Sequence, residues 1–130
     1  MTAATDYYED KLARTTFQNE AYSVAQTYVS LHTSDPTDAA AATELTDSGY
    51  ARIAASWNAP VVGAGTVSNS AAIEFNAIAD AGPFTVTHIG IWDALSGGNL
   101  LIYAPLTVSK VFSLNDVPRF PIGSLVPKYA

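Results

Sequence analysis

The residues best suited to chemistry in this chain are two histidines, His32 and His88, each set in a run of alternating apolar residues. Histidine is the usual proton carrier and a common metal ligand near neutral pH. The two lie on different predicted strands, and neither has a second ligand two or four residues away on the same face. We therefore expect His88 to be a hydrogen-bonded core histidine and His32 a strand-end residue. The sequence predicts no catalytic residue, no metal ligand and no cofactor site.

Other motifs are equally weak. No Gly-x-Ser-x-Gly stands at a strand-to-helix turn, and Gly63-Ala64-Gly65 is followed by neither a lysine nor a helix. The run from Ser34 to Asp38 lacks the glycine and closing glutamate of a calcium loop, so a turn is favoured over adventitious calcium binding. Trp57 and Trp92 would suit a sugar-binding surface, but aromatic residues are more typical of strands and cores. We expect a protein that is not an enzyme.

Charge is sparse and unbalanced. The chain has 12 acidic and 6 basic residues, a formal net charge of −6, and no cysteine. The basic residues are scattered, whereas nucleic-acid binding needs clustered Lys and Arg, so we expect no direct nucleic-acid partner. No apolar run reaches the roughly 20 residues of a membrane helix, and the first residues do not resemble a signal peptide. With 48% hydrophobic and only 14% charged residues, part of the surface is expected to be covered by other proteins.

The pattern predicts one helix followed by strands within a single domain covering residues 1–130. A helix is expected over residues 6–19, capped by Asp6 with Glu9 three residues later. From residue 26 to 117 the apolar period is two, with polar turns about every ten residues, which is typical of a β-sandwich or jelly roll. The clearest strand spans 66–75, where Asn69 is the one polar residue on the apolar face.

A second strand, 84–93, is apolar on both faces and is followed by a tight hairpin signal at 96–99. The loop around 37–46 is the one stretch expected to be disordered. The predicted core, placed between two sheets, consists of Ile73, Phe75, Val86, Ile89, Ile91, Trp92, Leu100 and Ile102.

The two ends of the chain are the predicted interaction surfaces. The helix has too small an apolar stripe to be stable alone. Residues 118–130 are apolar but contain three prolines, which cannot donate to a central β-ladder, so an extended C-terminal arm is expected. The alternative is that this segment folds back on its own sheet as an edge strand. The candidate protein-interface residues are Tyr8, Leu12, Phe17, Phe120, Ile122, Leu125, Val126 and Tyr129.

Four stretches carry a resemblance to known proteins. They are 28–38 (Tyr-Val-Ser-Leu-His-Thr-Ser-Asp-Pro-Thr-Asp), 43–52 with Thr-Glu-Leu and Gly-Tyr-Ala-Arg, 68–75 (Ser-Asn-Ser-Ala-Ala-Ile-Glu-Phe), and 86–107 with Val-Thr-His-Ile-Gly-Ile-Trp-Asp-Ala, Gly-Gly-Asn-Leu-Leu and Leu-Thr. In this order they resemble a family of short bacteriophage virion structural proteins, often labelled tail fibre or minor structural protein. The proline-rich C-terminus departs from the alternating strand with which such proteins usually close.

The resemblance implies a compact β-domain in the virion, with no catalytic residues to carry over. From the acidic surface and the absence of shaft repeats, we expect a capsid decoration or cement protein. It would be a homo-oligomer, expected to be a trimer, that binds the major capsid protein at the capsid surface. The alternatives are a tail component (a baseplate, tail-tip or fibre-attachment module) and a host-glycan binding module.

Overall fold

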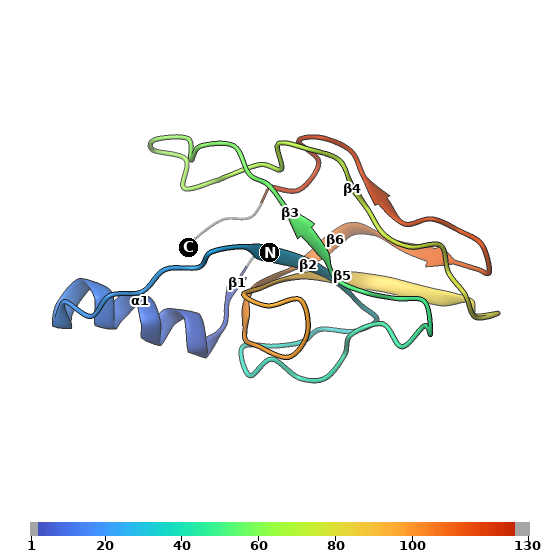
Figure 1. Ribbon diagram of the computed structural model, residues 1–130, viewed down its shortest axis with the longest axis horizontal. Helices are drawn as coiled ribbons and strands as arrows, with labels where there is room; N and C mark the ends of the chain where they lie inside the picture. The colour runs from blue at the N-terminus through green and yellow to red at the C-terminus, as the bar shows by residue number, and fades with distance from the viewer. Residues whose placement is uncertain (1–2, 127–130) are drawn as a thin grey trace.

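The computed structural model describes residues 3–126 and is dominated by one antiparallel sheet (Figure 1). In spatial order its strands are β1 (Ala3–Ala4), β6 (Leu100–Phe112), β5 (Phe84–Trp92), β2 (Thr27–His32) and β3 (Ile53–Ala55). A second sheet pairs β4 (Ile73–Glu74) with β7 (Arg119–Phe120). The one helix among the described residues, α1 (Asp6–Gln18), follows β1. The predicted mainly β fold with a short N-terminal helix is confirmed, while the jelly-roll detail stays a prediction.

The main hydrophobic core lies between the central strands of the large sheet and the segments that carry β4 and β7. Val29 and Leu31 of β2 and Val86 of β5 are fully buried, and Phe75 and Phe120 meet edge to face at 6.3 Å between ring centres. Seven of the eight predicted core residues are buried: Ile73, Phe75, Val86, Ile89, Ile91, Leu100 and Ile102. The eighth, Trp92, is only half-buried, and the guanidinium of Arg52 lies over its indole ring.

Helix α1 ends one residue before the predicted boundary, and Thr5, not Asp6, is its N-cap. The Thr5 side chain accepts a hydrogen bond from the backbone of Tyr8, and its hydroxyl also donates to Leu100 O at 2.6 Å. Thr5 is therefore buried and links the start of the helix to β6, which Asp6 could not do from its exposed position. No residue of α1 is buried; the helix meets the sheet through Tyr7 and Tyr8.

The strand predicted over 66–75 is wrong in its extent, since only Ile73 and Glu74 are in a ladder. Residues 57–69 instead form an irregular hairpin, with isolated bridges between Trp57 and Asn69 and between Val61 and Thr66. We call this segment the 57–69 hairpin. Figure 1 shows it, in green, projecting from the same end of the molecule as α1.

The C-terminal arm is also corrected by the structure. Within its described part, β7 pairs with β4, and Phe120 and Leu125 are buried in the chain's own core. Pro118 and Pro121 flank this two-residue strand, so neither interrupts a ladder. The segment folds back as a short edge strand, which was the alternative considered from the sequence.

Candidate functional site

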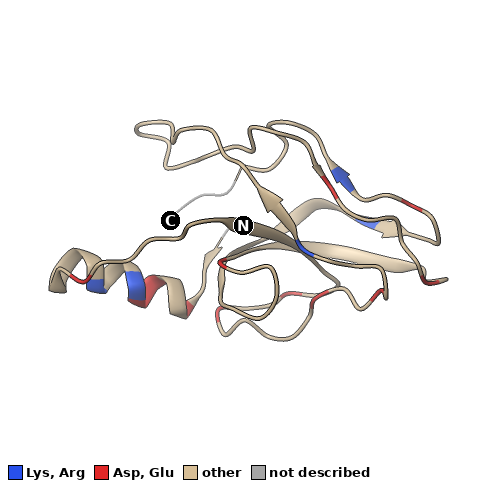
Figure 2. Ribbon diagram, in the orientation of Figure 1, with Lys and Arg blue, Asp and Glu red and all other residues tan. Residues whose placement is uncertain are grey.

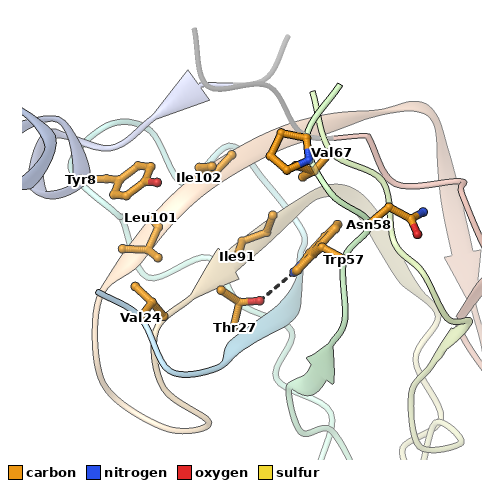
Figure 3. Close-up of a pocket in the computed structure, with 10 residues that line it drawn as sticks. Tyr8, Val24, Thr27, Trp57, Asn58, Val67, Ile91, Leu101 and Ile102 are labelled. Carbon is orange, nitrogen blue, oxygen red and sulfur yellow. Dashed lines mark hydrogen bonds between the residues drawn. The ribbon is translucent and has the colours of Figure 1, made fainter. Parts of the chain in front are cut away.

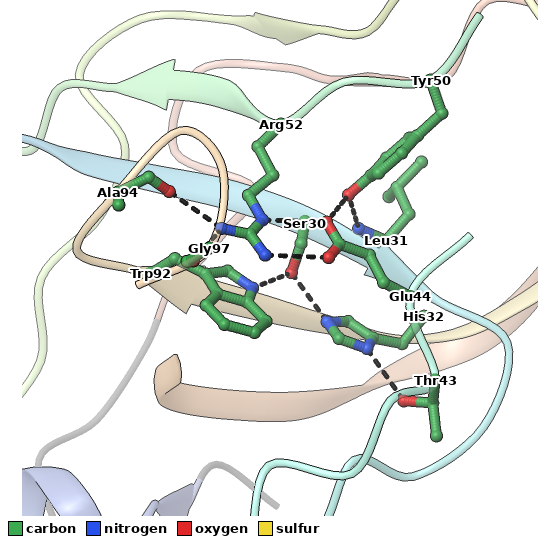
Figure 4. A network of polar contacts seen from close by, with 10 residues as sticks. All are labelled: Ser30, Leu31, His32, Thr43, Glu44, Tyr50, Arg52, Trp92, Ala94 and Gly97. Atoms are coloured by element: carbon green, nitrogen blue, oxygen red, sulfur yellow. Dashed lines mark hydrogen bonds and ion pairs between the residues drawn. The ribbon is translucent and has the colours of Figure 1, made fainter. Parts of the chain in front are cut away.

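The densest cluster of polar groups is a buried network centred on Arg52, shown in Figure 4. Arg52 is only 8% exposed. Its guanidinium binds both oxygens of Glu44 at 2.9 Å and donates to the carbonyls of Ala94 at 2.9 Å and Gly97 at 2.8 Å. The same group lies 3.6 Å from the centre of the Trp92 ring, close enough for a cation–π contact. Arg52 thereby joins three segments that are distant in sequence.

Glu44 and Tyr50 complete one side of this network. Tyr50 donates to Glu44 at 2.5 Å and accepts from the backbone N–H of Leu31 at 3.1 Å. Burial opposes ionisation of Glu44, but the hydrogen bonds from Arg52 and Tyr50 outweigh it and leave the pKa of Glu44 below its usual value. Burial, together with the Glu44 carboxylate, raises the pKa of the Tyr50 hydroxyl. The pair is therefore a carboxylate and a neutral phenol held for structure.

His32 lies on the other side of the network and is fully buried. The Trp92 indole N–H donates to Ser30 Oγ at 2.8 Å, and the same hydroxyl shares a hydrogen bond of 2.7 Å with His32 Nε2. His32 Nδ1 shares a hydrogen bond of 2.9 Å with Thr43 Oγ1, so both ring nitrogens have partners inside the chain. Burial is the main cause that lowers the pKa of His32 to about 4.

Gly90 makes this close packing possible. It sits opposite Ser30 in the β2–β5 ladder, and a Cβ at this position would lie 2.6 Å from Ser30 Oγ and 2.8 Å from His32 Nε2.

Every polar side chain of the network has a partner inside the chain. The loop that was expected to be disordered, 37–46, is bonded to the sheet through Thr43 and Glu44. The network fastens loops to the sheet.

His88, the second histidine considered from the sequence, is half-buried, not a core residue. Its Nδ1 shares a hydrogen bond of 2.8 Å with Thr87 Oγ1, and its Nε2 lies 4.0 Å from an Asp35 oxygen. Across residues 3–126, no three His, Asp or Glu side chains come close enough together to hold a metal ion. In the same range, no helix is long and apolar enough to cross a membrane.

The predicted interface residues divide into three groups. Phe17, Ile122 and Val126 are exposed, at 84%, 68% and 49%. Leu12 is just exposed and Tyr8 is half-buried against the sheet. Phe120 and Leu125 are buried in the chain's own core, and Tyr129 lies outside the described residues.

A surface that sequence reasoning missed is an apolar cleft of about 260 Å³ between α1 and the 57–69 hairpin (Figure 3). Ile91 and Leu101 form its floor, Tyr8 lies on the helix side, and Trp57 and Val67 lie on the hairpin side. None of its lining residues is charged. The sequence feature that could have indicated this surface is the run 53–73, which contains no charged residue and no histidine. The residues that face this run across the cleft come from α1, β5 and β6.

Fold and surface together define a small, mainly β protein with an internally satisfied polar network and an uncharged, apolar cleft. The family model described as Podophage GP4 fiber I protein gp80 matches residues 3–128, and the chain belongs to this family of phage fibre proteins. No curated protein matches the chain. The resemblance to phage virion structural proteins, with tail fibre among their labels, is confirmed. Glu44, Tyr50, Arg52 and Trp92 all fall within the stretches that carried it.

Proposed function

We propose that this protein is a non-enzymatic structural component of the phage tail, in which it is part of a fibre or its attachment and acts through contacts with other virion proteins. The match of a fibre family over residues 3–128 carries this proposal. It favours the tail over the capsid surface, so the tail component takes precedence over the decoration protein expected from the sequence.

The polar network supports the non-enzymatic part of the proposal. A catalytic group needs an open position beside it for a substrate atom. Here the Arg52 guanidinium, the Glu44 carboxylate and the His32 ring are each engaged by neighbours in the same chain. Displacing any of these partners would leave a buried polar group unpaired, which costs about 1–3 kcal/mol.

The location is tested by separating heads from tails of purified particles and quantifying the protein in each fraction by mass spectrometry. We expect it in the tail fraction, at a few to a few dozen copies per particle. Hundreds of copies in the head fraction would instead identify a capsid decoration protein. Specific binding on a glycan array would point to a host-glycan binding module.

A further inference from the structure

The outer part of α1 and the chain that follows it project from the β-domain. Figure 1 shows α1, in blue, extending beyond the end of the sheet, and the chain after it running back toward β2. We call residues 9–21 the N-terminal projection; they are exposed, except that Lys11 is half-buried. The helix is attached only at its other end, where Thr5 is buried and Tyr7 and Tyr8 pack against the sheet.

The polar contacts of the N-terminal projection are local. Arg14 binds Asp10 at 2.8 Å and lies 3.8 Å from Glu20, and Figure 2 shows the basic residues of α1 beside acidic ones of the same helix. Lys11 lies 5.6 Å from the centre of the Tyr7 ring, at the base of the helix. Within the described part of the chain, no hydrogen bond, ion pair or ring contact joins the projection to a strand.

A helix that is attached only at its first turn must supply its own stability. α1 has 13 residues, and an isolated helix shorter than about 12–15 residues is marginal in water. Its last residues include Thr15, Thr16 and Phe17, which favour a helix less than Ala, Leu or Lys do. The last turn also has no basic residue to complement the helix dipole. The end of α1 therefore lacks both tertiary support and strong intrinsic support.

From these features we infer that the N-terminal projection unfolds and refolds independently of the β-domain, and that it is the site where the folded chain is open to proteolytic cleavage. Elements with few buried contacts open locally at a small cost in free energy, whereas core strands open only with the whole domain. A protease cuts the open form, so its rate reports the population of that form. The projection can thus change conformation on contact with a neighbour while the β-domain stays folded. This inference goes beyond the proposed function and does not depend on where in the phage the protein lies.

Two arginines of similar exposure provide an internal comparison. The Arg14 side chain is 47% exposed and the Arg119 side chain is 54% exposed. Arg14 lies in the projection, whereas Arg119 lies in β7, next to the buried Phe120. The full-length chain is digested with trypsin under native conditions, and the fragments are quantified by mass spectrometry. We expect cleavage after Arg14 to be at least about a hundredfold faster than cleavage after Arg119. Synthetic peptides that span the two sites correct for the sequence preference of trypsin.

The independence of the two parts is tested with the same substitution at two positions. Ala13→Pro breaks the interior of α1, and Ala104→Pro, the matched control, breaks β6 opposite Ile89 in the β5–β6 ladder. Thermal unfolding followed by circular dichroism measures both variants. We expect Ala13→Pro to reduce the helical signal and to change the melting temperature by less than about 2 °C, and Ala104→Pro to lower it by at least about 5 °C.

Either measurement is able to overturn the inference. If, after correction with the peptides, trypsin cuts after Arg14 no faster than after Arg119, the projection does not open separately. If Ala13→Pro lowers the melting temperature as much as Ala104→Pro does, α1 unfolds together with the β-domain and is part of one cooperative unit.

Discussion

His32 is a buried histidine whose ring is kept neutral by its surroundings. Its two ring nitrogens share hydrogen bonds with the hydroxyl groups of Ser30 and Thr43, and the ring has no exposed surface, so the charged form would lose its hydration. Burial lowers the pKa of His32 from 6.5 to about 4, and the nearby Arg52 and His88 act in the same direction while Glu44 opposes them.

This shift predicts a pH dependence of stability. Because the folded-state pKa of His32 lies below the unfolded value, the unfolded chain binds more protons as the pH falls from 6.5 toward 4. The stabilisation is complete above pH 6.5, and we expect about 2 kcal/mol of it to be lost by pH 5. Urea unfolding at pH 7 and pH 5 measures the loss. His32→Gln should lower stability at pH 7 and largely abolish the pH dependence; an unchanged slope would mean that another group is responsible.

Asn69 shows how a single polar residue can hold a chain terminus. Its side chain donates to Pro121 O and accepts from Leu125 N, both at 2.9 Å. Its backbone N–H donates to Leu125 O at 3.3 Å, and its carbonyl accepts from Gly123 at 3.0 Å. The residue that looked misplaced on an apolar face is the partner that the C-terminal segment needs.

Asn69→Ala should therefore be costly. It leaves the buried N–H of Leu125 without its acceptor and removes one of the two hydrogen bonds to Pro121 O, which still accepts from Ser124, so we expect a loss of about 2 kcal/mol in the free energy of unfolding. Asn58→Ala is the matched control: Asn58 is exposed and makes one side-chain bond to Ser68, so its loss should be about 0.5 kcal/mol or less. Chemical denaturation of both variants measures the difference. Equal effects would show that the C-terminal segment is not held by Asn69.

At the scale of elements, β7 and the residues after it act as part of the core. Phe120 is 6% exposed and packs against Phe75, whereas Ile122, two residues later, is 68% exposed. Because burial changes so much between two residues this close together, substitutions at Phe120 and Ile122 should have very different effects on stability.

We expect Phe120→Ala to reduce stability by about 3–5 kcal/mol through the cavity it leaves. Ile122→Ala should cost about 0.5 kcal/mol or less, because its side chain is already in solvent. Thermal or urea unfolding gives both values. The same reasoning predicts that deleting residues 119–130 destabilises the whole β-domain; a truncated chain as stable as the full one would contradict the packing of β7.

For the whole molecule, the net charge of −6 sets the conditions under which copies can meet. If they associate through uncharged surfaces, salt should strengthen the association by screening the repulsion between the remaining charges. The screening length falls from about 10 Å at 0.1 M salt to about 3 Å at 1 M. We expect the dissociation constant, measured by sedimentation across this range, to fall as salt rises. A rise would indicate an interface held by ion pairs.

The sequence by itself determined the elements that depend on neighbours along the chain. A run that is apolar on both faces predicted β5, the glycines at 97 and 98 predicted the turn before β6, and Asp6 with Glu9 three residues later predicted the start of α1. Seven of the eight core residues followed from the same periodicity. These features are local, so a pattern of residue types is enough to indicate them.

Only the tertiary structure decided the positions whose partners are remote. From the sequence, Arg52 would be taken for a surface charge, but in the structure Glu44, Trp92 and the carbonyl of Gly97 surround it. Asn69 is a misfit in its predicted strand, but in the structure its side chain bonds to residues 121–125. The cleft likewise needs α1 and the 57–69 hairpin on the same side of the sheet. A buried polar or charged residue is tolerated only when distant groups satisfy it, and residue periodicity carries no information about which distant groups will arrive.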